Sequence, residues 1–169
     1  MSATGAPAAG SRPGSPAGSL WAYALDVYGR AGVEARLMEL QDAHGQSIPY
    51  LIWSLWMAAT GRSPDVATLE AGAALARSWE AAAVAPLRRL RRELKTSSAG
   101  PARRREHLRG GVQKLEFDAE RMLLEMLEDA SPAPGDGPPP PAEALAKAAA
   151  AWGAPPPAKL LQDLALHAA

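Results

Sequence analysis

The sequence predicts an all-α protein: a single irregular helical bundle with a long antiparallel helical hairpin, a short C-terminal helical pair and no sheet. Apolar residues recur at helical spacing through most of the 169 residues, and no run alternates with the period of two that a half-buried strand requires. Alanine, the best helix former, supplies much of the 47% hydrophobic content. Composition divides the chain into a disordered tail (1–18), the bundle (19–130), a Pro/Gly-rich linker (131–141) and the C-terminal helical hairpin (142–169).

The first two predicted helices are short. Ser19 can cap a helix over Leu20–Tyr28, because its hydroxyl can accept from a free backbone N–H of the first turn. A second helix is expected over Val33–His44, and Gly45 follows it where a left-handed residue commonly ends a helix.

The third predicted helix, Ile48–Ala59, is apolar nearly all round. Ser47 is expected to cap it, Pro49 is tolerated in its first turn and Gly61 fits its end. A helix of this kind must be surrounded, so it is expected to be the centre of the core. It is too short to span a bilayer, which takes roughly 20 apolar residues.

A long helical hairpin is expected next. Its first arm starts at the signal Ser63–Asp65, with Ser63 as the cap, Pro64 at the first helical position and Asp65 in the first turn. It continues to about Lys95, with a bend near Pro86 because proline disrupts a helix interior. A turn over Thr96–Gly100 leads to the second arm, which runs from Pro101 to about Asp129. The apolar positions of this arm alternate steps of four and three, which is typical of a packed seam: Leu108, Val112, Leu115, Ala119, Met122 and Met126.

The segment Ser131–Pro141 is expected to be a stiff linker, because of its proline run. Two short helices should follow over Ala142–Trp152 and Pro157–His167. The pattern leaves open whether this pair docks on the bundle or contacts a partner.

Composition and motifs exclude several function classes. The 18 basic and 18 acidic residues cancel, so no global field draws the protein to nucleic acid or to a membrane. The chain has no cysteine, no metal-ligand spacing around its three histidines, no phosphate-binding glycine loop and no GxSxG motif. We therefore expect no cofactor, no metal and no transmembrane segment. The N-terminal tail lacks the pattern of a signal peptide, and the cysteine-free composition fits the cytoplasm.

One candidate site is a polar corner beside aromatic walls. Gln41 lies at the edge of the buried face of its helix, where an amide must find hydrogen-bond partners. Two interpretations stay open: a structural staple of the following turn, which is favoured, or a small-ligand pocket. The candidate pocket consists of Gln41, Asp42, Tyr50, Trp53 and Trp56.

The other candidate site is an arginine-rich hairpin tip. If the two long arms pair about Ser98, cations before and after the turn lie side by side, while acidic residues gather at the other end of the hairpin. Such a tip attracts anions: an acidic protein face, nucleic-acid phosphate or anionic lipid. A solvated surface is the more ordinary interpretation. The candidate anion-binding residues are Arg88, Arg91, Arg92, Lys95, Arg103, Arg104 and Arg105, with Arg89 and Arg109 nearby.

The region Leu20–Asp129 resembles a family of small, uncharacterised proteobacterial proteins of unknown function. The resemblance is carried by Leu20-Trp21 with Tyr28, by Leu40-Gln41-Asp42 with Gly45, by Leu51-Ile52-Trp53 with Leu55-Trp56, by Pro86-Leu87 with the following arginines, and by Ala119-Glu120. It implies an all-helical fold and a bacterial cytosolic setting, and it implies no activity, cofactor or catalytic residue.

Three functional hypotheses remain. The first is a non-enzymatic cytoplasmic interaction or regulatory protein that acts on an unknown protein partner. The second is a small-ligand binder or enzyme with a pocket near Gln41, Asp42 and Trp56. The third is an anion or nucleic-acid binder that acts through the hairpin tip; it is not favoured for single strands, because no aromatic side chain lies between the arginines to stack on bases.

Overall fold

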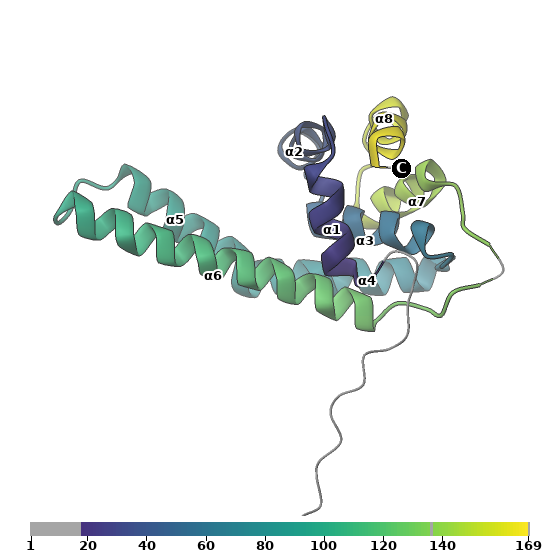
Figure 1. Ribbon diagram of the computed structural model, residues 1–169, viewed down its shortest axis with the longest axis horizontal. Coiled ribbons are helices and arrows are strands. Elements are labelled where there is room, and N and C mark those ends of the chain that lie inside the picture. The colour runs from purple at the N-terminus through teal and green to yellow at the C-terminus, as the bar shows by residue number, and fades with distance from the viewer. Residues whose placement is uncertain (1–17, 136, 169) are drawn as a thin grey trace, which may run out of the picture.

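The computed structural model describes residues 18–135 and 137–168, and over these residues it is all-helical with no strand (Figure 1). The predicted fold class is therefore confirmed. The predicted disordered tail lies outside the described residues except for Gly18.

Three short helices begin the fold: α1 (Leu20–Gly29), α2 (Val33–His44) and α3 (Ile48–Ala59). The Ser19 side chain accepts from the N–H of Ala22, and Gly45 ends α2 with a left-handed φ of 63°, as the sequence predicts. Ser47 occupies the N-cap position of α3 as predicted, but its Oγ makes no capping hydrogen bond and instead donates to Glu80 Oε1 at 2.6 Å. The Ser47 hydroxyl is thus bound by a carboxylate far along the chain and not by the backbone of its own helix.

Helix α3 is the centre of the core, and ten of its twelve residues are buried. One of its two indole rings, that of Trp53, packs so closely on the next helix that a Cβ at Gly72 would lie 2.6 Å from it. Helix α3 is apolar on all faces because other helices pack on every side of it, including α1, α2, α4 and α6.

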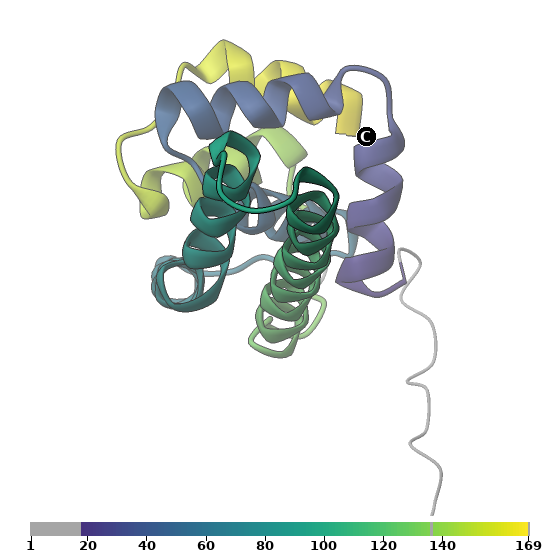
Figure 2. The same cartoon turned by 90° about the vertical axis from the view of Figure 1, so that its left-hand side faces the viewer.

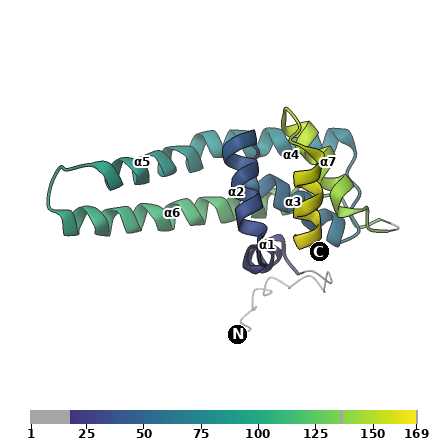
Figure 3. The same cartoon turned by 90° about the horizontal axis from the view of Figure 1, so that it is seen from above.

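The long hairpin forms the second layer. Helix α4 (Val66–Trp79), a π-helical turn η1 (Glu80–Val84) and α5 (Ala85–Thr96) make one arm, and α6 (Ala102–Asp129) makes the other. Asp65, rather than Ser63, caps α4: its Oδ1 accepts from the N–H of Thr68 at 2.8 Å. The half of the hairpin formed by α5 and the start of α6 projects beyond the other helices (Figures 1 and 3).

The expected disruption near Pro86 takes the form of the π-helical turn. The N–H of Ala85 donates to the carbonyl of Glu80, five residues back rather than four. Pro86 has no N–H to offer, and its ring would clash with a carbonyl in a regular α-helical turn. Widening the preceding turn accommodates the ring while the arm continues as helix.

The predicted seam of α6 is wrong at three of its six positions. Val112 and Ala119 are buried as expected, but Leu108, Leu115 and Met122 are respectively 55%, 56% and 48% exposed. The buried face of α6 is rotated away from the predicted one, because it packs on α3 and the α4–α5 arm and includes a charged residue. Its buried residues are Val112, Glu116, Ala119, Leu123, Leu124 and Leu127.

The C-terminal pair, α7 (Pro141–Trp152) and α8 (Ala158–Ala168), docks on the bundle. Leu145 of α7 and Leu164 of α8 are fully buried in the same hydrophobic core as α3. The Trp152 ring stacks on Tyr50 with 5.4 Å between centroids, and its Nε1 donates to the carbonyl of Gly45. Of the two options left open by the sequence, docking is the one that the structure contains.

Candidate functional site

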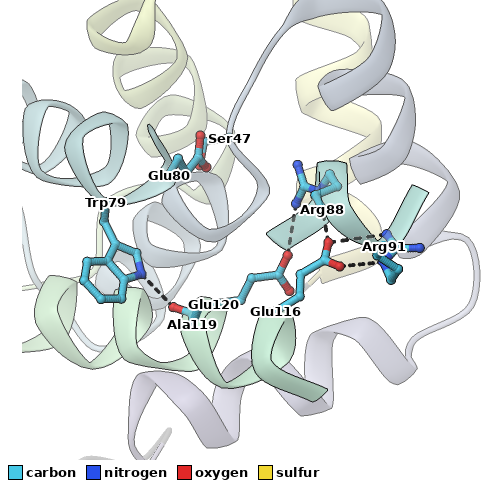
Figure 4. A network of polar contacts seen from close by, with 8 residues as sticks. All are labelled: Ser47, Trp79, Glu80, Arg88, Arg91, Glu116, Ala119 and Glu120. Carbon is cyan, nitrogen blue, oxygen red and sulfur yellow. Dashed lines mark hydrogen bonds and ion pairs between the residues drawn. The ribbon is translucent and has the colours of Figure 1, made fainter. Parts of the chain in front are cut away.

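A network of charged side chains lies where the projecting hairpin leaves the bundle (Figure 4). Its centre is Glu116 of α6, which is only 7% exposed. Arg88 Nε lies 3.1 Å from Glu116 Oε1, and Arg91 Nε lies 2.5 Å from Glu116 Oε2. One nearly buried carboxylate thus holds two arginines of α5 against α6.

Further polar contacts extend this network toward the core. Arg88 also reaches Glu120 with 3.0 Å between Nη2 and Oε1. The Trp79 Nε1 donates to the carbonyl of Ala119 at 2.8 Å, which ties the end of α4 to the middle of α6 (Figure 4). Glu80, the first residue of the π-helical turn, accepts from Ser47 and so connects the arm to the start of α3.

The two carboxylates of α6 have opposite pKa shifts. Burial alone would raise the pKa of Glu116, but hydrogen bonds and charge from Arg91 and Arg88 outweigh it, and the pKa is lowered. Burial dominates at Glu120: the pKa is raised, with the nearby Glu116 charge adding to burial and Arg88 opposing it. Glu116 is therefore held as an anion, which suits an anchor for arginines.

Arg88 and Arg91 do not belong to the predicted tip, since both are engaged by Glu116 at the hairpin base. Arg105 donates from Nη1 to the carbonyls of Ala99 and Gly100, and it thereby holds the loop between α5 and α6. Arg109 pairs with Glu106 at 2.6 Å within its own helix.

The remaining cations form what we call the tip cluster. They are exposed and form no ion pair with any residue that the structure describes: Arg92, Lys95, Arg103 and Arg104. Lys95, Arg103 and Arg104 flank the loop between α5 and α6 at the far end of the hairpin, and Arg92 lies about one turn back from Lys95 on α5. The hairpin end itself is seen in Figure 3.

The predicted polar pocket is not assembled as one site. Gln41 and Asp42 line a groove of about 480 Å³ between α2 and α5, whose other wall carries Arg88, Arg89 and Arg92. The three aromatic rings of the prediction are instead in the core, with at most 1% exposed. Their polar atoms donate within the protein, to acceptors that include the Leu69 carbonyl and the Ser131 hydroxyl.

Sequence reasoning missed the anchors of this network, above all Glu116 and Glu80. Glu116 follows Val112 by four residues and precedes Ala119 by three, so it continues the helical spacing of buried positions. An acidic residue at a buried position of one arm, opposite several arginines on the other arm, is the pattern that could have identified Glu116. Nothing in the local sequence indicates that Glu80 reaches Ser47.

Residues 18–135 and 137–168 contain neither a metal site nor a membrane-spanning helix. No group of three or more His, Asp or Glu side chains in this part of the chain is placed to hold a metal ion. None of its helices combines the length and the apolar character that crossing a bilayer requires.

Comparison with known proteins places these features in a family. A family model described as "Protein of unknown function (DUF2390)" matches residues 19–127. The chain belongs to this family. The DUF2390 match runs from α1 through nearly all of α6, so it contains the hairpin and its anchoring network, while α7 and α8 follow it. No curated protein and no solved structure matches the chain.

Proposed function

We propose that this DUF2390 protein is a non-enzymatic interaction protein of the bacterial cytoplasm that binds an acidic surface of a partner protein with its projecting hairpin. The observation that carries the proposal is the tip cluster: four exposed cations on the outer part of the hairpin with no ion pair among the described residues. Like charges gathered at a protruding end repel one another, and an acidic partner would relieve that repulsion.

The anchoring network supports a binding role because it makes the hairpin stiff. Arg88 and Arg91 join α5 to α6 through Glu116, and Arg105 holds the loop. A partner would therefore meet cations whose backbone positions are already fixed, which reduces the entropy lost on binding.

A protein partner is favoured over nucleic acid by the surroundings of the tip cluster. Leu90 and Leu108 are 42% and 55% exposed. Each lies within about one helical turn of a cation of the tip cluster. Exposed leucines beside cations suit a protein surface with both apolar and acidic side chains. Four cations offer few phosphate contacts, and phosphate contacts supply most non-specific affinity for nucleic acid.

Capture from a bacterial lysate tests the proposal. Immobilised full-length protein should retain specific proteins at low salt and release them as salt screens the tip cluster. The variant Lys95→Glu/Arg103→Glu should lose these proteins. A matched variant, Lys147→Glu/Lys159→Glu, reverses two charges on α7 and α8 and should retain them.

Two results would contradict the proposal. Equal capture by both charge-reversed variants would remove the tip cluster as the binding surface. Capture that disappears on nuclease treatment would transfer the role to nucleic acid.

A further inference from the structure

An exposed apolar stripe runs along the middle of α6, from Leu108 to Met122. Leu108, Leu115 and Met122 are spaced seven residues apart, so they share one side of the helix. Each is about half exposed: 55%, 56% and 48%. Over 14 residues this stripe is about 21 Å long. Scattered exposed apolar residues are ordinary, but a stripe in heptad spacing is a helix-packing surface.

Gly111 lies on the same side, three residues after Leu108 and four before Leu115. Glycine weakens a helix interior, so its presence needs a reason. The fold of one chain supplies none: a Cβ at Gly111 would meet nothing within 4 Å of its position. A second helix that packs closely on this side would use the space that the missing side chain leaves.

The charge of α6 is divided between its two halves. Residues 102–115 carry five Arg or Lys and one Glu, whereas residues 116–129 carry six Asp or Glu and one Arg. Charged side chains are exposed on both halves, including Arg104 and Lys114 on the first and Asp118 and Asp129 on the second. Such a helix attracts a copy of itself in the antiparallel direction and repels one in the parallel direction.

We propose that the protein forms a homodimer in which the α6 stripes of two copies pack antiparallel, with the two-fold axis near Leu115. The equal spacing of the stripe makes it self-complementary about that axis, as an isologous interface requires. Leu115 then meets the partner's Leu115, and Leu108 meets the partner's Met122. The basic half of each α6 lies along the acidic half of the other.

This inference goes beyond the proposed function and shares Leu108 and Arg104 with it. Arg92 and Lys95 of the tip cluster lie on α5, away from the α6 stripe, and they stay available to a different partner when two copies associate. A dimer of this geometry places the two hairpin tips at opposite ends.

Cross-linking tests the arrangement cleanly, because the chain has no cysteine of its own. A short bismaleimide should join two copies of the Leu115→Cys protein. It should not join Leu108→Cys to itself, since those positions are about 21 Å apart in the antiparallel dimer. An equal mixture of the Leu108→Cys and Met122→Cys proteins should cross-link. Efficient self-linking of Leu108→Cys, or no more linking at Leu115 than at the exposed control Leu166→Cys, would overturn the proposal.

Sedimentation of the full-length protein gives an independent measurement. The wild type should sediment as a concentration-dependent dimer, and Leu115→Glu should weaken association by at least about tenfold, as expected for a residue at an interface centre. Leu166→Glu is the matched control, because Leu166 is 76% exposed on α8. A wild type that stays monomeric into the hundreds of micromolar, a weak range for protein association, would refute the dimer.

The neighbouring glycines allow a finer comparison. Gly111→Ala should weaken association, because its methyl group enters the close contact. Gly110→Ala changes the helix in the same way on a different side and should leave association unchanged. Equal effects of the two variants would contradict close packing at Gly111.

Discussion

At the scale of single residues, the fold depends on two close contacts between segments far apart in the sequence. Gly72 lets the fully buried Trp53 ring lie directly on α4. Glu116 holds Arg88 and Arg91, which are 28 and 25 residues earlier in the chain. In both cases the residue type is dictated by its tertiary neighbour and contradicts its local preference, since glycine disfavours a helix and a charge disfavours burial.

Gly72→Ala should destabilise the protein although alanine is the better helix former. A Cβ at this position would lie 2.6 Å from two atoms of the Trp53 ring, and the ring is enclosed on all sides. Overpacking of this kind costs about 1–3 kcal/mol, which exceeds the gain in helix propensity. Urea unfolding monitored by tryptophan fluorescence measures the change. Gly110→Ala is the control: a Cβ there meets nothing within 4 Å, and an unchanged or raised stability is expected. Wild-type stability in Gly72→Ala would refute the close contact.

Glu116 should make stability depend on pH. Its pKa is lowered in the folded protein, so its contribution is present above the ordinary glutamate pKa of 4.5 and is lost as the pH falls through the lowered value. The raised pKa of Glu120 acts in the opposite direction: its protonated form favours the fold, and that contribution is lost as the pH rises through the raised value.

Glu116→Gln separates these effects. It leaves two arginines with a neutral partner and should cost about 1–3 kcal/mol at pH 7, less than a fully buried pair because both arginine side chains are 28% exposed. The difference from wild type should begin to shrink below pH 4.5, where the carboxylate of the unfolded chain gains a proton, and should disappear as the pH falls through the lowered pKa of Glu116 in the folded protein. Urea unfolding at a series of pH values measures this, with the exposed Glu106→Gln as control. A difference that does not change with pH would show that Glu116 acts through packing alone.

At the scale of helices, the sequence predicts the elements well because nearby residues determine where most helices begin and end. The cap at Ser19 and the glycine at Gly45 act on residues within one turn, and both are confirmed. The cap at Ser47 failed because its hydroxyl is taken by Glu80, 33 residues away. The π-helical turn before Pro86 could not be predicted, because it depends on how the arm is held by residues before and after it. No local sequence pattern contains that information.

The faces of helices were harder to predict than their bounds. A heptad of apolar residues shows that one side of α6 is suited to packing, but it does not say on what. The heptad spacing predicts Leu108, Leu115 and Met122 in the inner seam, whereas the fold buries the side with Val112 and Glu116. Likewise Gln41 and the rings of α3 share no pocket, because α5 rather than α3 lies beside Gln41. Both errors arise from contacts between elements.

At the scale of the whole molecule, the hairpin is one layer and the short helices are packed on it. Figure 2, seen along the hairpin from its tip, shows α5 and α6 in front, α2 crossing above them and α1 beside α6. Helices α7 and α8 complete the upper side, where α7 covers α3 and α4 and α8 packs on α7 and α2. The core is therefore closed from both ends of the sequence, and the projecting hairpin is its only long extension among residues 18–135 and 137–168.

A chain that ends at Asp129 should accordingly fail to fold as a cooperative unit. It would expose the Tyr50 ring where Trp152 stacks on it, uncover the side of α3 on which Leu145 packs, and leave the Trp53 Nε1 without the Ser131 hydroxyl. Burying several large side chains contributes about 1.5–3 kcal/mol each, so their loss is comparable with the whole stability of a domain. Thermal unfolding followed by circular dichroism, together with binding of a dye specific for exposed apolar surface, measures the result. A shortened chain with a sharp transition and no dye binding would show that α1–α6 form a self-sufficient domain. We expect a broad transition with dye binding instead, because α7 and α8 are structural parts of the core. Partner binding must therefore be measured on the full chain.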